Sequence, residues 1–147
     1  MDPAARRAAM RAEIVARTSI DEAMIEKLVR GFYDRIQKDE MLAPVFAEKI
    51  SDWEPHLQNM FAFWSSVALA SGAYHGRPME KHVFLPVDAA HFDRWLQLFE
   101  ATARELCPPA AADHFIDRAR RVAESLELGM AQVAGVTLKP GERFKRA

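Results

Sequence analysis

Apolar residues recur every three or four positions along most of the chain, with polar residues between them. This period is typical of helices that bury one face. The clearest case predicts a helix over about 19–38, and Ser19 and Glu22 have the spacing of a capping box at its start. The apolar face of this helix consists of Met24, Ile25, Leu28, Phe32 and Ile36.

The next segment, EMLAPVFAEKI, is short and broken by Pro44, which predicts a turn with a single helical turn around Phe46. A second capping box, Ser51 with Glu54, then opens a long helix that runs to Gly72. Pro55 falls in its first turn, where the missing N–H of proline does no harm.

Two prolines and a glycine interrupt the stretch AYHGRPMEKHVFLPVD, which predicts a loop with a short helix near His82. Asp88 can cap the following helix, expected over about 89–106 and ended by Pro108 and Pro109. A last helix is expected over about 111–133.

The sequence has no alternating strand pattern, no repeats and no low-complexity tract, so it predicts an all-α fold. We expect three parts: an N-terminal extension over 1–18 that forms a short helix, a main domain over 19–133 and a flexible C-terminal tail over 134–147.

Composition narrows the class of partner. The 147 residues are enough for one domain with a substantial core. The formal net charge is −1, which argues against nucleic-acid binding, and no run approaches the roughly 20 apolar residues that span a membrane. Cys107 is the single cysteine, which excludes an internal disulfide and a thiolate zinc site and favours a reducing, cytoplasmic location.

Polar groups fall on or beside otherwise apolar helix faces at three places. His56 begins a stripe that continues with Met60, Phe63 and Val67. Tyr33 lies one residue round from the apolar face of the first helix, and Trp95 lies in a stripe with Phe92 and Phe99. Each residue taken alone is commonly an ordinary core or surface residue, but hydrogen-bonding groups that converge on an apolar interior are what a small polar ligand needs.

His82, in MEKHVFLP, has no cysteine or second histidine within a few residues. A histidine in a proline-bounded loop is most often simply exposed. However, a long apolar helix and a return loop lie between His56 and His82 in the sequence. This spacing can place the two imidazoles on opposite sides of a flat cofactor.

Four segments carry a resemblance to a known family, in this order: FYDRI with KDEMLAPVF, DWEPHLQNMFAFW, GAYHGRPMEKHVFLP and HFDRWLQLFE. In these the chain resembles the truncated haemoglobins of the third group, over roughly residues 19–130. The glycine-pair motifs of the other truncated groups are absent, which suits the third group. The resemblance implies the truncated globin fold, a two-over-two helical sandwich, with 19–133 as the haem-binding domain and haem b, iron protoporphyrin IX, as cofactor.

The resemblance also implies a role for each matching residue. His82 matches the proximal ligand of the iron, Tyr33 and Trp95 match the distal pair that hydrogen-bonds a bound gas, and His56 matches a distal histidine that can gate the pocket. One proximal ligand is enough, because the porphyrin supplies four nitrogens and the sixth position stays open. His75 and His91 are weaker candidates for that ligand. The expected apolar contacts with haem are Phe46, Met60, Phe63, Leu85 and Phe92.

The resemblance implies O2, NO or CO as ligands of ferrous iron. Oxygen bound there takes on superoxide character, so hydrogen bonds from Tyr33 and Trp95 would slow its release by roughly 10- to 150-fold each. Slow release suits redox chemistry on the bound ligand, such as nitric oxide detoxification with an unidentified reductase, better than transport.

Several alternatives stay open from the sequence. Peroxide activation uses the same distal donors, and a gas sensor would use the same pocket and signal through a partner. A helical interaction domain without cofactor would explain the stripes as plain core. A mononuclear iron site would require His56, His82 and an acid such as Glu80 to converge.

Overall fold

The computed structural model describes residues 2–146, and every regular element in that range is a helix. No strand occurs between these residues, so the all-α prediction is confirmed. The helices are α1 (Pro3–Thr18), α2 (Glu22–Lys38), α3 (Ala43–Lys49), α4 (Trp53–Leu69), α5 (Pro78–His82), α6 (Ala89–Leu106) and α7 (Pro109–Val133).

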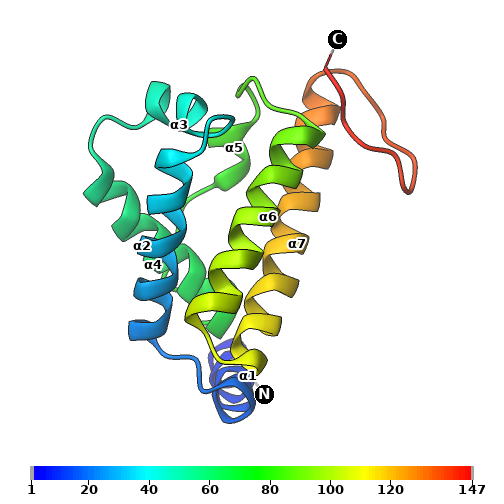
Figure 1. Cartoon of the computed structure of the whole chain (residues 1–147). Helices are drawn as coiled ribbons and strands as arrows, with labels where there is room; N and C mark the ends of the chain where they lie inside the picture. The colour runs from blue at the N-terminus through cyan, green and yellow to red at the C-terminus, as the bar shows by residue number, and fades with distance from the viewer. Residues whose placement is uncertain (1, 147) are drawn as a thin grey trace.

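Four long helices form two packed pairs. Helix α2 packs against α4, and α6 packs against α7, while α2 also contacts α6 and α4 contacts α7 (Figure 1). The apolar face predicted for α2 lies between the pairs, where Ile25, Leu28, Phe32 and Ile36 are at most 1% exposed. The arrangement is the two-over-two sandwich that the sequence predicts.

Neither predicted capping box forms at the start of its helix. The α1 helix extends to Thr18, so Ser19 closes it in a left-handed conformation (φ 60°) and cannot cap α2. Asp21 takes that role, and its carboxylate accepts a hydrogen bond from the Met24 N–H at 2.8 Å. At α4 the capping position falls to Asp52, not Ser51, without a side-chain hydrogen bond. A capping box does occur at α6, between Asp88 and His91.

The N-terminal segment forms a helix as expected, and α1 packs across α4 and α7 at the lower end of the molecule in Figure 1. Its contact runs through Ile14 and Thr18, which are buried. Helix α4 is slightly shorter than predicted, because Ala70 adopts a left-handed conformation (φ 54°) and ends it before Gly72.

The C-terminal tail departs from the prediction of a flexible segment. Phe144 is only 2% exposed and packs beside α6 and α7. The buried carboxylate of Glu127 accepts two hydrogen bonds from Arg143, at 2.8 and 2.9 Å, and a third from the Phe144 N–H at 3.0 Å. The Phe144 carbonyl accepts a hydrogen bond from the Ala89 N–H at 2.7 Å. These partners lie far away in sequence, so no local pattern could reveal them.

Replacing Phe144 with alanine should therefore destabilise the fold. Loss of a fully buried phenylalanine costs about 3 kcal/mol or more of the free energy of unfolding. Urea denaturation measures this value. Phe84→Ala is the matched control: because Phe84 is 84% exposed, its replacement should change stability by less than about 0.5 kcal/mol. Equal, small effects of both variants would mean that the tail does not pack as described.

Candidate cofactor-binding site

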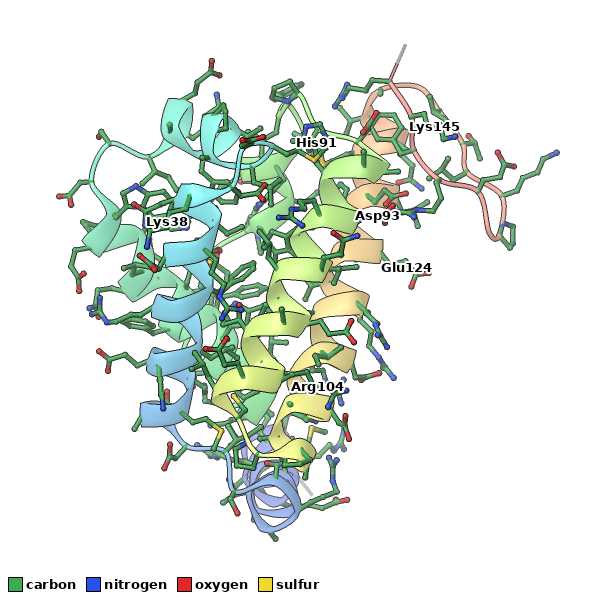
Figure 2. The ribbon with its side chains drawn as sticks, viewed as in Figure 1. Lys38, His91, Asp93, Arg104, Glu124 and Lys145 are labelled. Carbon is green, nitrogen blue, oxygen red and sulfur yellow. The ribbon has the colours of Figure 1, made fainter. Side chains whose placement is uncertain are left out.

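A cavity of about 430 Å³ lies between the two helix pairs, within the range of roughly 300–1,000 Å³ typical of small-molecule sites. Every helix except α1 contributes to its wall. Helix α6 contributes residues from its first half, so the cavity lies toward the end of α6 where Figure 2 labels His91 and away from the end labelled Arg104.

All the site residues predicted from the sequence line this one cavity. They come from five helices, α2 to α6, and from the loop after α5. The residues are Tyr33, Phe46, His56, Met60, Phe63, His82, Leu85, Phe92 and Trp95. Their individual roles toward a cofactor remain predictions.

His82 is the last residue of the short helix α5, and one ring nitrogen is already engaged. Its Nδ1 lies 2.6 Å from the carbonyl oxygen of Pro78. Because a carbonyl oxygen can only accept, Nδ1 must carry the hydrogen. In the neutral ring the other nitrogen, Nε2, then carries the lone pair, which is the arrangement that metal-ligating histidines usually adopt.

His56, from the first turn of α4, has a buried Nε2 with no hydrogen-bond partner among residues 2–146. Burial is the main cause that lowers the pKa of this imidazole, and the positive charge of Lys81 lowers it further. The ring is therefore neutral near pH 7. Buried polar atoms in native proteins are rarely left without a partner, so an orphaned nitrogen beside a cavity points to a bound group.

Tyr33 stands next to His56, with their ring centroids 5.2 Å apart in an edge-to-face arrangement. Its side chain is buried, which raises the pKa of the hydroxyl above its usual range and keeps it protonated. A protonated phenol can donate a hydrogen bond into the cavity.

Trp95 is held by two aromatic neighbours in the core. Its ring lies edge-on to Phe32 at 5.3 Å and stacks on Phe99 at 5.5 Å. The indole N–H is a donor only, so the half-buried Trp95 can donate a hydrogen bond to an acceptor in whatever fills the cavity.

Sequence reasoning missed several wall residues. Trp53 is the most prominent missed aromatic, because it packs on three cavity-lining rings: it stacks on Phe46 at 6.2 Å, lies 5.6 Å from His56 and contacts Tyr33. It sits inside the motif DWEPHLQNMFAFW, which is the only signal that could have found it. Trp53 supports the wall from behind these rings. Residues that do line the cavity and had no predicted role include Lys49, Asn59, Tyr74, Val122, Ala123 and Leu126.

Two lysines, Lys49 and Lys81, put positive charge on an otherwise apolar wall, so they can pair with acidic groups of a ligand. Arg77, in the same region of the sequence, does not line the cavity and instead pairs with Glu80 at 3.2 Å.

The competing histidines are less suited to bind a metal. His75 is exposed and does not line the cavity. His91 reaches the cavity wall, but its Nδ1 accepts a hydrogen bond from the Asp88 N–H at 3.2 Å as part of the α6 cap.

The alternative of a mononuclear iron site is wrong. Between residues 2 and 146, no group of three or more histidine, cysteine, aspartate or glutamate side chains is placed to hold a metal ion. Glu80, the acid considered for such a site, is exposed. The cavity instead fits a large flat cofactor that brings most of its own metal ligands, since it is mainly apolar and the His82 imidazole can supply one further ligand.

Comparison with known proteins gives concordant matches. A model of the bacterial-like globin family matches residues 20–127. The group 3 truncated hemoglobin ctb of Campylobacter jejuni is 30% identical over 114 residues, which cover 74% of this chain and 90% of that protein. The group 1 truncated hemoglobin GlbN of Nostoc commune is 37% identical over 70 residues, 47% of this chain and 58% of that protein.

A solved structure matches over most of the chain as well. The crystal structure of a group III truncated hemoglobin from Campylobacter jejuni has a TM-score of 0.69 and 28% identity, and it covers 84% of this chain and 95% of that one. Helix α1 lies before the range matched by the family model. Within residues 2–146 none of the helices has the length and apolar character needed to cross a membrane.

The lowered pKa of His56 predicts a pH dependence of stability. Below about pH 6.5 the unfolded chain binds a proton at this imidazole that the folded protein resists, so stability falls as pH falls. Each such group contributes a slope of at most about 1.4 kcal/mol per pH unit, and buried His114 acts in the same direction.

Urea denaturation of the apoprotein between pH 5 and 7.5 should show a shallower slope for His56→Gln than for the wild type. His75→Gln, at an exposed position, serves as the control and should leave the slope unchanged. Parallel curves for His56→Gln and wild type would contradict the assignment of a buried, neutral His56.

Proposed function

Because this chain belongs to the bacterial-like globin family, as a truncated haemoglobin of group III, we propose that it binds haem b in the cavity with His82 as the proximal ligand. The observation that carries the proposal is the hydrogen bond from His82 Nδ1 to the Pro78 carbonyl. That bond fixes the tautomer and frees Nε2 on a cavity wall.

The rest of the wall suits a porphyrin. Apolar contact would come from Phe46, Met60, Phe63, Leu85 and Phe92. Lys49 and Lys81 are the cations available to the carboxylate groups of the cofactor. Haem supplies an iron with a sixth coordination position at which O2, NO or CO can bind.

Tyr33 and Trp95 act as donors toward such a ligand. The phenol stays protonated because it is buried, and the indole N–H cannot ionise under physiological conditions, so both donors are present at any physiological pH. A hydrogen bond to a charged acceptor contributes about 1.5 to 3 kcal/mol, so each donor slows release of a polarised ligand. A protein with two such donors would release oxygen too slowly for transport.

Slow release favours redox chemistry on the bound ligand. The reaction that we propose is nitric oxide detoxification, in which NO, O2 and one electron give nitrate. The electron must come from a reductase that remains to be identified. The chain's own part is to hold oxygen beside two hydrogen-bond donors while nitric oxide enters the apolar cavity.

His56 favours peroxidase-like activity as a second candidate. Its imidazole is neutral, and its buried Nε2 lacks a partner in the described part of the chain. A neutral imidazole beside a bound peroxide can accept its proton and return it to the leaving oxygen. Assays with peroxide and with nitric oxide on the same preparation separate the two activities, and loss of only the peroxide reaction in His56→Gln would support this role.

The remaining predictions follow from the same proposal. Residues 19–133 would form the haem-binding unit, with α1 outside it, and the single buried cysteine favours work in the reducing cytoplasm.

Haem binding can be tested by adding hemin to the purified protein. The wild type should give a sharp Soret band, and His82→Ala should lose or broaden it because the iron loses its protein ligand. His75→Ala should keep the wild-type spectrum, since His75 is exposed and away from the cavity. A band that persists unchanged in His82→Ala would show that another residue is the ligand.

The role of the distal donors can be tested by stopped-flow oxygen dissociation. Tyr33→Phe should release oxygen roughly 10- to 150-fold faster, because one hydrogen bond to the bound ligand is lost. Tyr74→Phe is a matched control: Tyr74 also lines the cavity, but its hydroxyl lies against Gly76 in the loop before α5. A rate for Tyr33→Phe within about twofold of the wild type would refute the role of its hydroxyl.

A further inference from the structure

Gly129 lies inside helix α7, one turn before its end. Glycine disfavours the interior of a helix relative to alanine, and here it is not the helix cap, which is Ala134. Its backbone is not left-handed either, unlike that of Gly72, Gly135 and Gly141. The reason for a glycine here must therefore lie in packing.

Met79 of α5 supplies that reason. A Cβ atom added at Gly129 would lie 2.5 Å from the sulfur of Met79, too close for any real contact. The missing side chain thus leaves a notch in the surface of α7, and the thioether of Met79 fills it. We call this contact the Gly129–Met79 notch.

Helix α5 depends on such an anchor. It has five residues, no side-chain cap at its start and no buried residue. A helix of that length is not stable by itself, so contacts with other elements must hold it. Its partner is α7, and these two helices are in direct contact.

The notch is directly linked to His82. Pro78, whose carbonyl accepts the hydrogen bond from His82 Nδ1, is the residue before Met79. The Met79 carbonyl accepts a hydrogen bond from the N–H of Val83, the residue after His82, at 3.0 Å. A displacement of Met79 therefore moves both ends of the turn that orients the imidazole.

We infer that Gly129 and Met79 are positioning residues, which set the place and orientation of His82 by fixing α5 in the notch. This inference rests on the proposed function, in that His82 is taken as the haem ligand. The Met79 side chain is flexible, so a larger residue at position 129 would expel it from the notch without unfolding α7. The iron–histidine bond would then be strained or lengthened.

The test uses the hemin-loaded protein and two readouts that do not depend on activity. These are the iron–histidine stretching band of the ferrous form in resonance Raman spectra and the rate of haem transfer to apomyoglobin. Gly129→Ala should shift or broaden the band and speed haem loss roughly tenfold, as overpacking typically does. Leu128→Ala, at the exposed neighbouring position, should change neither.

Variants of Met79 separate positioning from general destabilisation. Met79→Leu keeps an apolar side chain of similar size and should stay within about twofold of the wild type. Met79→Ala should show the same kind of change as Gly129→Ala. The double variant combines Gly129→Ala with Met79→Ala, so the new methyl group at position 129 has no Met79 side chain to clash with. Haem loss should then be no faster than in Gly129→Ala alone, a non-additivity that is expected for residues in contact.

Two results would overturn the inference. One is a Gly129→Ala protein with a wild-type band and rate; the other is strict additivity of the two single effects in the double variant. Failure of the proposed function looks different: His82→Ala would then keep its Soret band and its iron–histidine band, which would remove the basis of both proposals.

Discussion

Packing around Phe32 is the interaction on which the site depends. This fully buried ring of α2 contacts Trp95 and Phe99 of α6, with centroids 5.3 and 5.1 Å apart, and so locks one helix pair onto the other. Tyr33, the next residue, must then face a different direction along α2, which is toward the cavity wall. The hydrophobic core thereby places Tyr33 and Trp95 at the cavity wall through aromatic packing.

An apolar cavity also sets the charge state of its polar groups. Burial keeps Tyr33 protonated and His56 neutral, so this part of the cavity wall offers hydrogen bonds without fixed charge. Positive charge enters the wall at Lys49 and Lys81, side chains with long flexible stems that can keep their ammonium groups near water. Neutral donors inside and cations among the apolar wall residues are suited to a cofactor with an apolar ring and acidic substituents.

The part of the wall that carries His82 is built differently, because α5 has five residues and is too short to be stable without contacts to other elements. Before His82, the side chain of Met79 packs against Gly129 of α7. After His82, the C-terminal tail holds the loop. There the guanidinium of Arg146 donates to the carbonyl oxygens of Leu85 and Val87, both at 2.9 Å. Helix α7 and the residues that follow it thus support α5, with His82 at its end, and the loop after it. This gives the C-terminal segment a structural reason to be ordered.

Much of the fold of this protein could be predicted from its sequence, because a helix with one buried face requires apolar residues at regular intervals along the chain. The period of three to four residues gave the all-α class and nearly all helix ranges, and motif resemblance brought together side chains such as Tyr33, His56 and His82 that indeed line one cavity. Other features were decided by tertiary structure alone. Ser19 ends α1 and therefore does not cap α2. The N–H of the buried Phe144 donates a hydrogen bond to the distant Glu127. Gly129 makes room for the side chain of Met79, fifty residues earlier in the chain. The contacts of Phe144 and Gly129 join residues far apart in sequence, and such contacts leave no periodic signal along the chain.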